Sequence, residues 1–210
     1  MIKDLISKTP ISVVSVTGDG VCLNRDIVEI KSQTNDSILA YQSVSIFIDQ
    51  NLGSIQEVTD NFDLIWKAYA ECSYDGNILT DSLKTVMEYW HNCNLKNFET
   101  FLKEHPMLHT DGLYYGVEEV DRNEMNQQFG SYTIKQVAGL KPTAIQWHSK
   151  KDECKEFTVE DFTVLAVAIE NYTLPYYSLM QSRKKGIFQC EDKLSVFNIP
   201  ITYEIITTEE

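Results

Sequence analysis

The hydrophobic pattern changes its period near residue 50, and this change limits the fold more than any other feature of the sequence. Residues 38–48 show period-two alternation, with Val44, Ile46 and Ile48 two apart, as in a strand with one covered face. From Ile55 onward the apolar side chains recur at intervals of three and four residues, as they do along one face of a helix. Strands that precede helices without alternating with them predict an α+β fold.

The N-terminal part is predicted to form a small antiparallel sheet. Residues 11–16 are rich in β-branched side chains, and residues 21–30 make a plausible return strand. They flank a turn at residues 17–20, where glycines reach positive φ at low cost. A second turn at residues 34–37 leads into strand 38–48. We expect the segments that follow to cover one face of this sheet.

The middle of the chain is predicted to be helical. Ser54 and Glu57 have the spacing of a capping box, which opens a helix over residues 54–69. A turn then precedes a second helix, for which Asp81 is the expected cap. A third, short helix is expected to end near Pro106, because the residue before a proline disfavours the helical conformation.

The C-terminal part is predicted to contain a β-hairpin and a long helix. Residues 144–147 form the first strand, a turn lies at residues 150–152, and the return strand ends at Phe157. Thr158 caps the helix with an acidic residue at its third position. Pro175 is expected to kink or end this helix, because proline lacks an N–H group and clashes with the preceding turn.

Shorter elements complete the C-terminal half. Residues 113–117 are a strand candidate, and Asp121 with Glu124 is a cap signal for a helix through Phe129. Residues 201–205 alternate like a final strand.

The domain boundary is expected near residues 105–112. A boundary at this place divides the chain into two predicted domains. Residues 1–107 hold the sheet and helices, and residues 108–210 hold the hairpin and the long helix. A chain of 210 residues is long enough to bury a core in either arrangement.

Charge and cysteine content weigh against several functions. The 31 acidic and 18 basic residues give a net charge of −13, so we expect no direct contact with nucleic acid or with an anionic membrane. The five cysteines are widely spaced and form no Cys-x-x-Cys pair, which favours neither a disulfide framework nor a structural zinc site. The N-terminus lacks the apolar core of a signal peptide, and no apolar run approaches the ~20 residues that span a bilayer.

Two pairs of residues are candidates for cysteine-based catalysis. His91 and Cys93 point to different faces of a predicted helix, whereas His148 and Cys154 flank the predicted hairpin and could meet across it. A thiol nucleophile also needs an orienting third group, and no glycine-rich oxyanion loop accompanies either pair. We therefore expect no enzyme activity and no cofactor, and a cysteine-dependent hydrolase is kept as a third hypothesis.

The densest acidic cluster has two interpretations. Oxygen ligands at this spacing could hold a hard cation, but helix capping explains Asp121 and Glu124 without one. We favour the capping interpretation and expect no metal. The cluster consists of Glu118, Glu119, Asp121 and Glu124.

Aromatic and basic side chains supply the candidate interface. The 11 tyrosines include groups beside Gly116 and Pro175, and tyrosine is favoured at interfaces because it offers a large area and a polar group. A tyrosine-rich rim of the core would explain them equally well. The only compact basic run is either a contact for an acidic partner or a solvated helix end. The candidate interface residues are Tyr114, Tyr115, Tyr172, Tyr176, Tyr177, Arg183, Lys184 and Lys185.

Several short motifs follow one another in the C-terminal half. They are Tyr115-Gly116-Val117 before Asp121-Arg122-Asn123-Glu124, then Ile145-Gln146-Trp147-His148, an aromatic-Thr-x-x-Asp start at residues 157–161, a long helix to Tyr172, and Lys184-Lys185-x-Ile187. In these motifs, residues 108–199 resemble an uncharacterised domain family of phage tail and tail-fibre-associated proteins. The resemblance implies a virion location and no catalytic residues. Its expected partners are other virion proteins, such as tail, ring or fibre subunits, in a homo-oligomeric assembly.

The expected function is therefore that of a phage virion structural or tail-assembly component, made in the host cytoplasm, that acts through protein–protein docking. An acidic wall facing DNA would also repel it. The alternative is an acidic soluble inhibitor or adaptor protein that binds a basic partner, with strongly salt-dependent affinity.

Overall fold

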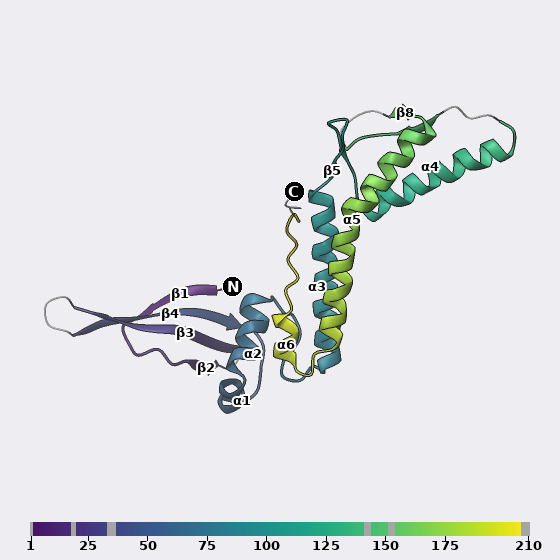
Figure 1. The fold of residues 1–210 in the computed structure, drawn as a ribbon. Helices are drawn as coiled ribbons and strands as arrows, with labels where there is room; N and C mark the ends of the chain where they lie inside the picture. The colour runs from purple at the N-terminus through teal and green to yellow at the C-terminus, as the bar shows by residue number, and fades with distance from the viewer. Residues whose placement is uncertain (1, 18–19, 33–36, 141–143, 151–153, 207–210) are drawn as a thin grey trace. The chain divides into compact units, whose positions relative to one another are not determined.

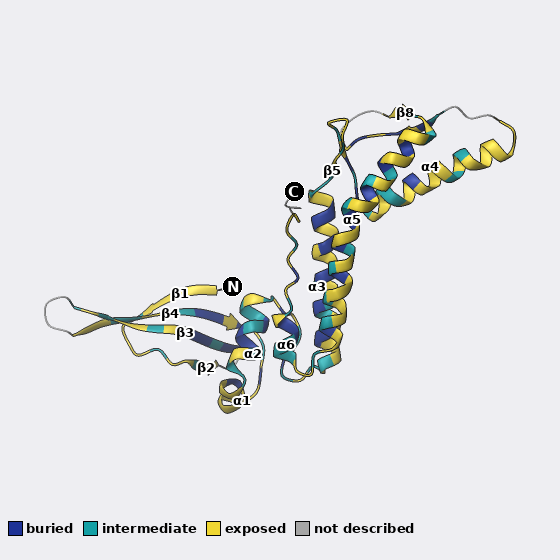
Figure 2. Cartoon of the chain, viewed as in Figure 1, coloured by how far each residue is buried: buried dark blue, intermediate teal, exposed yellow. Residues whose placement is uncertain are grey.

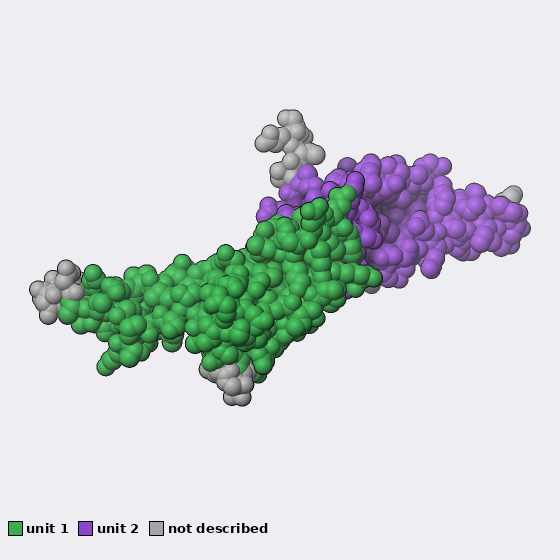
Figure 3. Space-filling model, turned by 90° about the horizontal axis from the view of Figure 1, so that it is seen from below, with its two compact units in different colours: residues 1–90, 188–199 green, residues 91–187, 200–210 purple. Residues whose placement is uncertain are grey.

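The chain forms two compact units, which Figure 3 shows in different colours. Unit 1 comprises residues 1–90 and 188–199, and unit 2 comprises residues 91–187 and 200–210. Unit 1 holds the larger sheet, and helices dominate unit 2, which confirms the predicted α+β class. The computed structural model describes residues 2–17, 20–32, 37–140, 144–150 and 154–206.

The two units differ from the predicted division into residues 1–107 and 108–210. Helix α3 (Leu83–Glu104) begins in unit 1 and ends in unit 2, and residues 188–199 return to unit 1. Contacts between residues far apart in the chain produce this division. An example is the indole Nε1 of Trp90, which donates to the carbonyl oxygen of Ile199 at 2.9 Å. Local composition carries no signal of such contacts.

A four-stranded antiparallel sheet forms the body of unit 1 (Figure 1). Its order is β1-β4-β3-β2, so the first two strands of the chain lie at opposite edges. The strands are β1 (Ile2–Ser7), β2 (Val14–Thr17), β3 (Gly20–Lys31) and β4 (Ile38–Ile48).

The predicted strands agree with this sheet in most places. Strand 38–48 is confirmed as β4, and strand 21–30 lies within β3, whereas the strand predicted at residues 11–16 begins only at Val14. β1 has no alternating pattern, because nearly all of it is exposed on both faces. The predicted turns at 17–20 and 34–37 fall mainly on residues 18–19 and 33–36, which lie outside the described residues.

One face of the sheet packs against the helices that follow it, as predicted. Val21 and Leu23 of β3 are paired with Ile48 and Ile46 of β4, and all four side chains are buried. On the same face, the guanidinium of Arg25 lies 4.9 Å from the Trp66 ring centroid. Cation–π attraction therefore adds to apolar burial at this contact.

The opposite face carries a buried polar cluster made by Asn24, Ser43 and Ser45. The Ser45 hydroxyl donates to Oδ1 of Asn24 at 2.6 Å, and the Ser43 hydroxyl does so at 3.4 Å. Nδ2 of Asn24 donates to the carbonyl oxygen of Ser12 at 2.7 Å. Since Ser12 belongs to the connection from β1 to β2, this bond holds the crossing segment on the sheet.

Short helical segments follow the sheet. Ser54 caps α1 (Ile55–Asp60), and its capping box with Glu57 is confirmed. The single helix predicted over residues 54–69 is wrong, because the backbone leaves the helical conformation at Asn61, with φ of −111° and ψ of 20°. The Asn61 side chain donates to the Glu57 carbonyl at this break, at 2.8 Å. The chain continues as α2 (Phe62–Trp66) and the π-helical turn η1 (Lys67–Glu71).

α3 corrects two predictions. The second and third predicted helices are one continuous helix of 22 residues. Its cap is Ser82, whose hydroxyl accepts from the Thr85 N–H at 3.1 Å, whereas the Asp81 carboxylate accepts a hydrogen bond from the Tyr74 hydroxyl at 2.6 Å. Asp81 therefore anchors a buried tyrosine instead of capping a helix.

Helix α6 (Lys193–Asn198) completes unit 1. The Phe197 ring packs edge-on against Trp90, with centroids 5.4 Å apart. The ammonium group of Lys193 donates to the carbonyl oxygens of Ile78 and Leu79 at 2.6 and 3.2 Å. Burial lowers the pKa of Lys193, opposed by the nearby Asp81 carboxylate.

Unit 2 is built around the C-terminal part of α3 and the long helix α5 (Val159–Phe188). Its core is aromatic and aliphatic, and Figure 2 shows the buried positions in dark blue. The remaining elements are β5 (Met107–Leu108), β6 (Tyr114–Tyr115), α4 (Glu119–Val137), β7 (Ile145–Trp147) and β8 (Lys155–Phe157).

The predicted hairpin and the start of the long helix are confirmed. β7 and β8 pair antiparallel, with Ile145 opposite Phe157. The Thr158 hydroxyl accepts from the Asp161 N–H at 3.0 Å, and Phe157 packs against Phe162 as a hydrophobic staple, with ring centroids 6.2 Å apart. Part of the predicted turn at 150–152 falls on residues 151–153, which lie outside the described residues.

Other C-terminal predictions need correction. The strand expected at 113–117 is reduced to β6. α4 begins at Glu119 and runs to Val137, well beyond Phe129. Of the two outcomes predicted at Pro175, an end of the helix is wrong, because α5 continues to Phe188. Figure 1 shows α5 changing direction along its length, in line with the predicted kink. Packing of α5 against the unit 2 core outweighs the hydrogen bond that a proline removes.

Residues 201–205 do not pair as a strand. They are held by side chains instead: Asn97 donates to the Ile201 carbonyl at 3.2 Å, and the Tyr203 hydroxyl donates to Oδ1 of Asn94 at 2.7 Å. The alternating pattern therefore reflects an extended segment with one side packed against unit 2.

Candidate protein-docking surfaces

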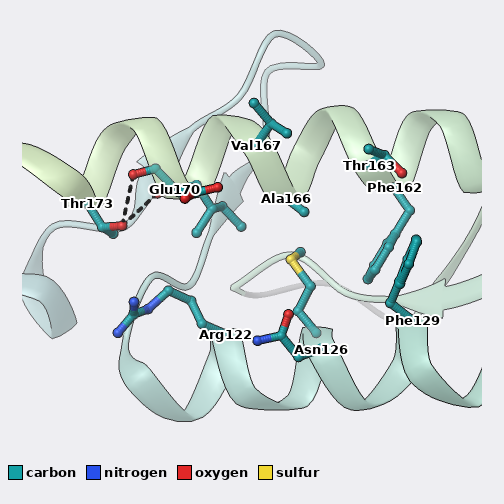
Figure 4. A pocket seen from close by; sticks show the side chains of 11 residues that line it. Arg122, Asn126, Phe129, Phe162, Thr163, Ala166, Val167, Glu170 and Thr173 are labelled. Carbon is teal, nitrogen blue, oxygen red and sulfur yellow. Dashed lines mark hydrogen bonds between the residues drawn. The ribbon is translucent and has the colours of Figure 1, made fainter.

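A groove between α4 and α5 is the first candidate site, and Figure 4 shows it closely. Its volume is about 430 Å³. Apolar side chains from both helices line it, and Phe129 and Val167 remain exposed at its surface. The lining residues are Arg122, Met125, Asn126, Phe129, Phe162, Thr163, Ala166, Val167, Ile169, Glu170 and Thr173.

The polar residues of this α4–α5 groove are largely engaged within unit 2. The Arg122 guanidinium lies 4.6 Å from the Tyr177 ring centroid and donates to the tyrosine hydroxyl. The Thr173 hydroxyl donates to the carbonyl oxygens of Ile169 and Glu170 (Figure 4). The groove therefore offers apolar area, the side-chain amide of Asn126 and one carboxylate, that of Glu170.

The C-terminal half of α4 carries two further exposed apolar side chains. Figure 2 shows that most of α4 is exposed, and Met125 is its one fully buried position among the described residues. Ile134 is 70% exposed and Val137 is 86% exposed, and their spacing of three places them on one side of the helix. Exposed apolar side chains that lie three residues apart on a helix are typical of a protein-binding element.

A second candidate surface is the outer part of the β3–β4 hairpin, which we call the β arm (residues 28–32 and 37–42). The register shifts between Arg25 and Val28, and Asp26 has a φ of 57°, which marks a β-bulge. Beyond it, Val28, Ile38 and Leu39 are exposed. β1 pairs with β4 only as far as Tyr41, so the arm beyond this residue is a two-stranded ribbon. Such a ribbon with exposed apolar residues is marginal alone and gains stability from a partner.

β1 is the third candidate surface, because it is an edge strand. Its inner edge pairs with β4, so the backbone groups on its outer edge are not used by the sheet. Ile2, Leu5 and Ile6 are exposed. Such an edge can accept a strand from another chain.

The structure separates the predicted interface tyrosines into buried and exposed groups. Tyr115 and Tyr176 are buried in the core of unit 2, so they cannot offer interface area in this fold. Tyr172 and Tyr177 are half-buried, and the Tyr172 hydroxyl donates to the His105 carbonyl at 3.0 Å. Burial raises the pKa of Tyr172, with a further contribution from Tyr176.

Tyr114 is the exposed member of the group. It lies directly opposite Leu108 in the β5–β6 pair, and both side chains are exposed. These two residues therefore form a small apolar patch on unit 2. The core-rim interpretation thus describes four of the five predicted tyrosines, and Tyr114 alone keeps a mainly exposed surface.

The predicted basic run lies in the last turns of α5. The Arg183 guanidinium stacks on the Tyr203 ring, 4.4 Å from its centroid, whereas Lys184 and Lys185 are exposed. Cations are favoured at a helix C-terminus, so this position fits the helix-end interpretation. The two lysines also stay accessible to a partner.

The candidate catalytic pairs form no catalytic arrangement among the described residues. His148 and Cys154 are both exposed, and the His148 ring contacts Trp147 with centroids 5.1 Å apart. Burial lowers the pKa of His91, and Lys184 lowers it further. Within the same part of the chain, no group of three or more His, Cys, Asp or Glu side chains could hold a metal ion.

The acidic cluster at the start of α4 is used locally. The carboxylate of Asp121 accepts from the Glu118 N–H at 3.0 Å, and Glu118 pairs with the Lys150 ammonium at 2.7 Å. Asp121 is thus the third residue of the helix and not its cap. The Asp121 carboxylate still takes part in capping. It does so from the third position of the helix, whereas the sequence placed it at the N-cap position.

The apolar groove was not part of the sequence prediction. A helix ending at Phe129 leaves Ile134 and Val137 out of consideration, although their spacing is helical. Reading this helix to residue 137 would have shown apolar side chains on more than one side. The groove itself depends on how α4 packs on α5, which local patterns do not determine.

The helices described by the structure include none with the length and apolarity needed to cross a bilayer. No protein-family model matches the chain, and comparison with curated proteins and with solved structures gave no match either.

Proposed function

We propose that this chain is a structural or assembly protein that docks onto other protein chains through the α4–α5 groove and the exposed side of α4. The observation that carries the proposal is the exposure of Ile134 and Val137, at 70% and 86%, on a helix that also lines the α4–α5 groove. Large apolar side chains that stay exposed on a folded unit are typical of an interaction site. Burying these two side chains is worth about 2 to 4 kcal/mol in binding free energy.

The proposed setting is a phage virion or its tail, as the resemblance of residues 108–199 implies. The partners are then other virion proteins, and repeated copies of the chain dock in a symmetric assembly. The β arm and the β1 edge provide additional contacts, since an assembly subunit needs more than one interface. This function requires no catalytic residue, cofactor or metal.

Incorporation into particles tests the proposal. Particles assembled with the wild-type chain and with the double variant Ile134→Ser/Val137→Ser are purified by density gradient and analysed by quantitative mass spectrometry. We expect the wild-type chain in the particles, and loss of about nine tenths of the incorporation for the variant, because roughly 2 kcal/mol of docking energy exceeds a tenfold change in affinity.

The matched control is Asn123→Ser/Gln127→Ser, which changes two exposed polar side chains on the same helix. It should leave incorporation unchanged. Circular dichroism of all three chains establishes that they fold alike. Equal incorporation of the apolar variant, or absence of the wild-type chain from particles, refutes the proposal.

The alternative function, an acidic inhibitor or adaptor, is favoured by the net charge of −13. It predicts a monomer whose binding to a basic partner weakens steeply with salt. Docking through apolar side chains predicts binding that changes little over the same salt range. A salt titration of the docking affinity therefore separates the two functions.

A further inference from the structure

A second pocket of unit 2, distinct from the α4–α5 groove, combines an apolar floor with an acidic rim. It lies between α3, the start of α4 and α5, and its volume is about 340 Å³. We infer that this acid-rimmed pocket binds a segment of a partner protein in which a large apolar side chain is flanked by lysine or arginine. The lining residues are Leu95, Phe98, Glu99, Leu102, Glu118, Glu119, Val120, Tyr177 and Met180.

The apolar floor is arranged to receive a side chain. Leu95, Phe98 and Leu102 follow the i, i+3, i+7 spacing of one helix face on α3. Phe98 and Leu102 are buried, while Leu95 at 36% and Val120 at 56% remain exposed at the rim. A partner's apolar side chain would therefore cover Leu95 and Val120 and contact the buried floor formed by Phe98 and Leu102.

The rim carries charge of one sign. All three charged lining residues are carboxylates, from two different helices. Glu118 is compensated by Lys150 at 2.7 Å, whereas Glu99 and Glu119 take part in none of the ion pairs among the described residues. Arg122, which contacts the lining residue Tyr177, is held by that ring and its hydroxyl.

This combination selects the chemistry of the partner. A purely apolar segment would desolvate Glu99 and Glu119 without compensation, which is unfavourable. An acidic segment would be repelled. A lysine or arginine lays its apolar stem along the pocket wall and places its charge at a carboxylate, so a basic and apolar segment satisfies floor and rim together.

The inference rests on the proposed docking function and assigns the partner chemistry at one further surface. Its test starts from the full chain immobilised as bait for random dodecapeptides displayed on filamentous phage. The selected peptides should contain leucine, phenylalanine or another large apolar residue with lysine or arginine within one helical turn. The strongest peptide is then synthesised, and its affinity is measured by fluorescence anisotropy.

Charge reversal at the rim provides the first control. The variant Glu99→Lys/Glu119→Lys should weaken peptide binding by about tenfold or more, because each attractive contact becomes a repulsive one. The matched variant Glu104→Lys/Glu204→Lys changes the net charge equally at two exposed positions of unit 2 outside the lining. This matched variant should change the peptide affinity by less than about threefold, because salt screens charges that lie far from the bound peptide.

Methyl NMR of the chain's five methionines locates the bound peptide. Met180 lines the acid-rimmed pocket, Met125 lines the α4–α5 groove, and Met87 lies in unit 1. The inference predicts that the peptide shifts the Met180 resonance and leaves those of Met125 and Met87 in place.

Three results would overturn the inference: no enrichment of basic and apolar peptides, equal weakening by both charge variants, or a shift of Met125 without Met180. None of these results affects the incorporation of the chain into particles. Conversely, normal incorporation of Ile134→Ser/Val137→Ser would refute the proposed function even if a peptide occupied this pocket.

Discussion

Replacing Asn24 by alanine should destabilise unit 1 more than most single changes. The substitution removes the acceptor of the Ser45 and Ser43 hydroxyls, at 2.6 and 3.4 Å, and the donor to the Ser12 carbonyl at 2.7 Å. The two serines can still bond to each other, since their oxygens are 3.1 Å apart, so one buried hydroxyl proton loses its acceptor. Ser12 is exposed, and water can replace the lost donor there.

The expected cost is about 2 to 3 kcal/mol, from the lost hydrogen bonds and one unsatisfied buried donor. Removing all three polar groups should cost less than removing one, because no buried group is then left without a partner. We therefore expect the triple variant Asn24→Ala/Ser43→Ala/Ser45→Ala to recover at least about 1 kcal/mol relative to Asn24→Ala.

Urea unfolding followed by tryptophan fluorescence measures these free energies. A Trp147→Phe background leaves Trp66 and Trp90, both of unit 1, so the signal reports that unit. The reasoning is refuted if Asn24→Ala changes the free energy of unfolding by less than about 0.5 kcal/mol, the usual range of surface substitutions. It is also refuted if the triple variant is no more stable than the single one.

Three further predictions concern other contacts. Tyr203→Phe should lower the stability of unit 2 by about 1 kcal/mol, since Asn94 is fully buried and loses its donor; thermal unfolding measures this, and an unchanged midpoint contradicts it. Ser54→Ala should cost about 1 kcal/mol by removing the cap of α1, whereas an unaltered urea midpoint for unit 1 would show that the box contributes nothing. Burial, reinforced by the hydrogen bond to Asp81, raises the pKa of Tyr74 above its usual value, so its contribution to stability is complete below pH ~10 and is lost as the pH rises through the raised pKa. Unfolding at increasing alkaline pH should therefore show a loss of stability that Tyr74→Phe reduces, and a parallel pH dependence in both chains would exclude this origin.

The sequence predicts those elements whose signals are local. The period of two in β4 reflects one covered face, and the caps at Ser54 and Thr158 depend on residues only three apart. The sequence allows either Asp81 or Ser82 to cap α3. The choice depends on Tyr74, whose hydroxyl donates to the Asp81 carboxylate and leaves Ser82 as the cap.

Elements that depend on distant contacts are not predictable in this way. α5 continues through Pro175 because its buried face packs against unit 2, and residues 201–205 lose their strand character because side chains of α3 hold them. The same limit applies to the docking surfaces. Exposed tyrosines and buried ones have the same sequence signal, and only the packing separates Tyr114 from Tyr115.

Hydrogen–deuterium exchange of the chain, free in solution and within purified particles, tests the docking account most directly. If α4 docks through the side that carries Ile134 and Val137, the amide hydrogens of residues 126–137 should exchange at least about tenfold more slowly in particles, because a covered helix opens less often. Exchange at the same rate in both states would contradict the account.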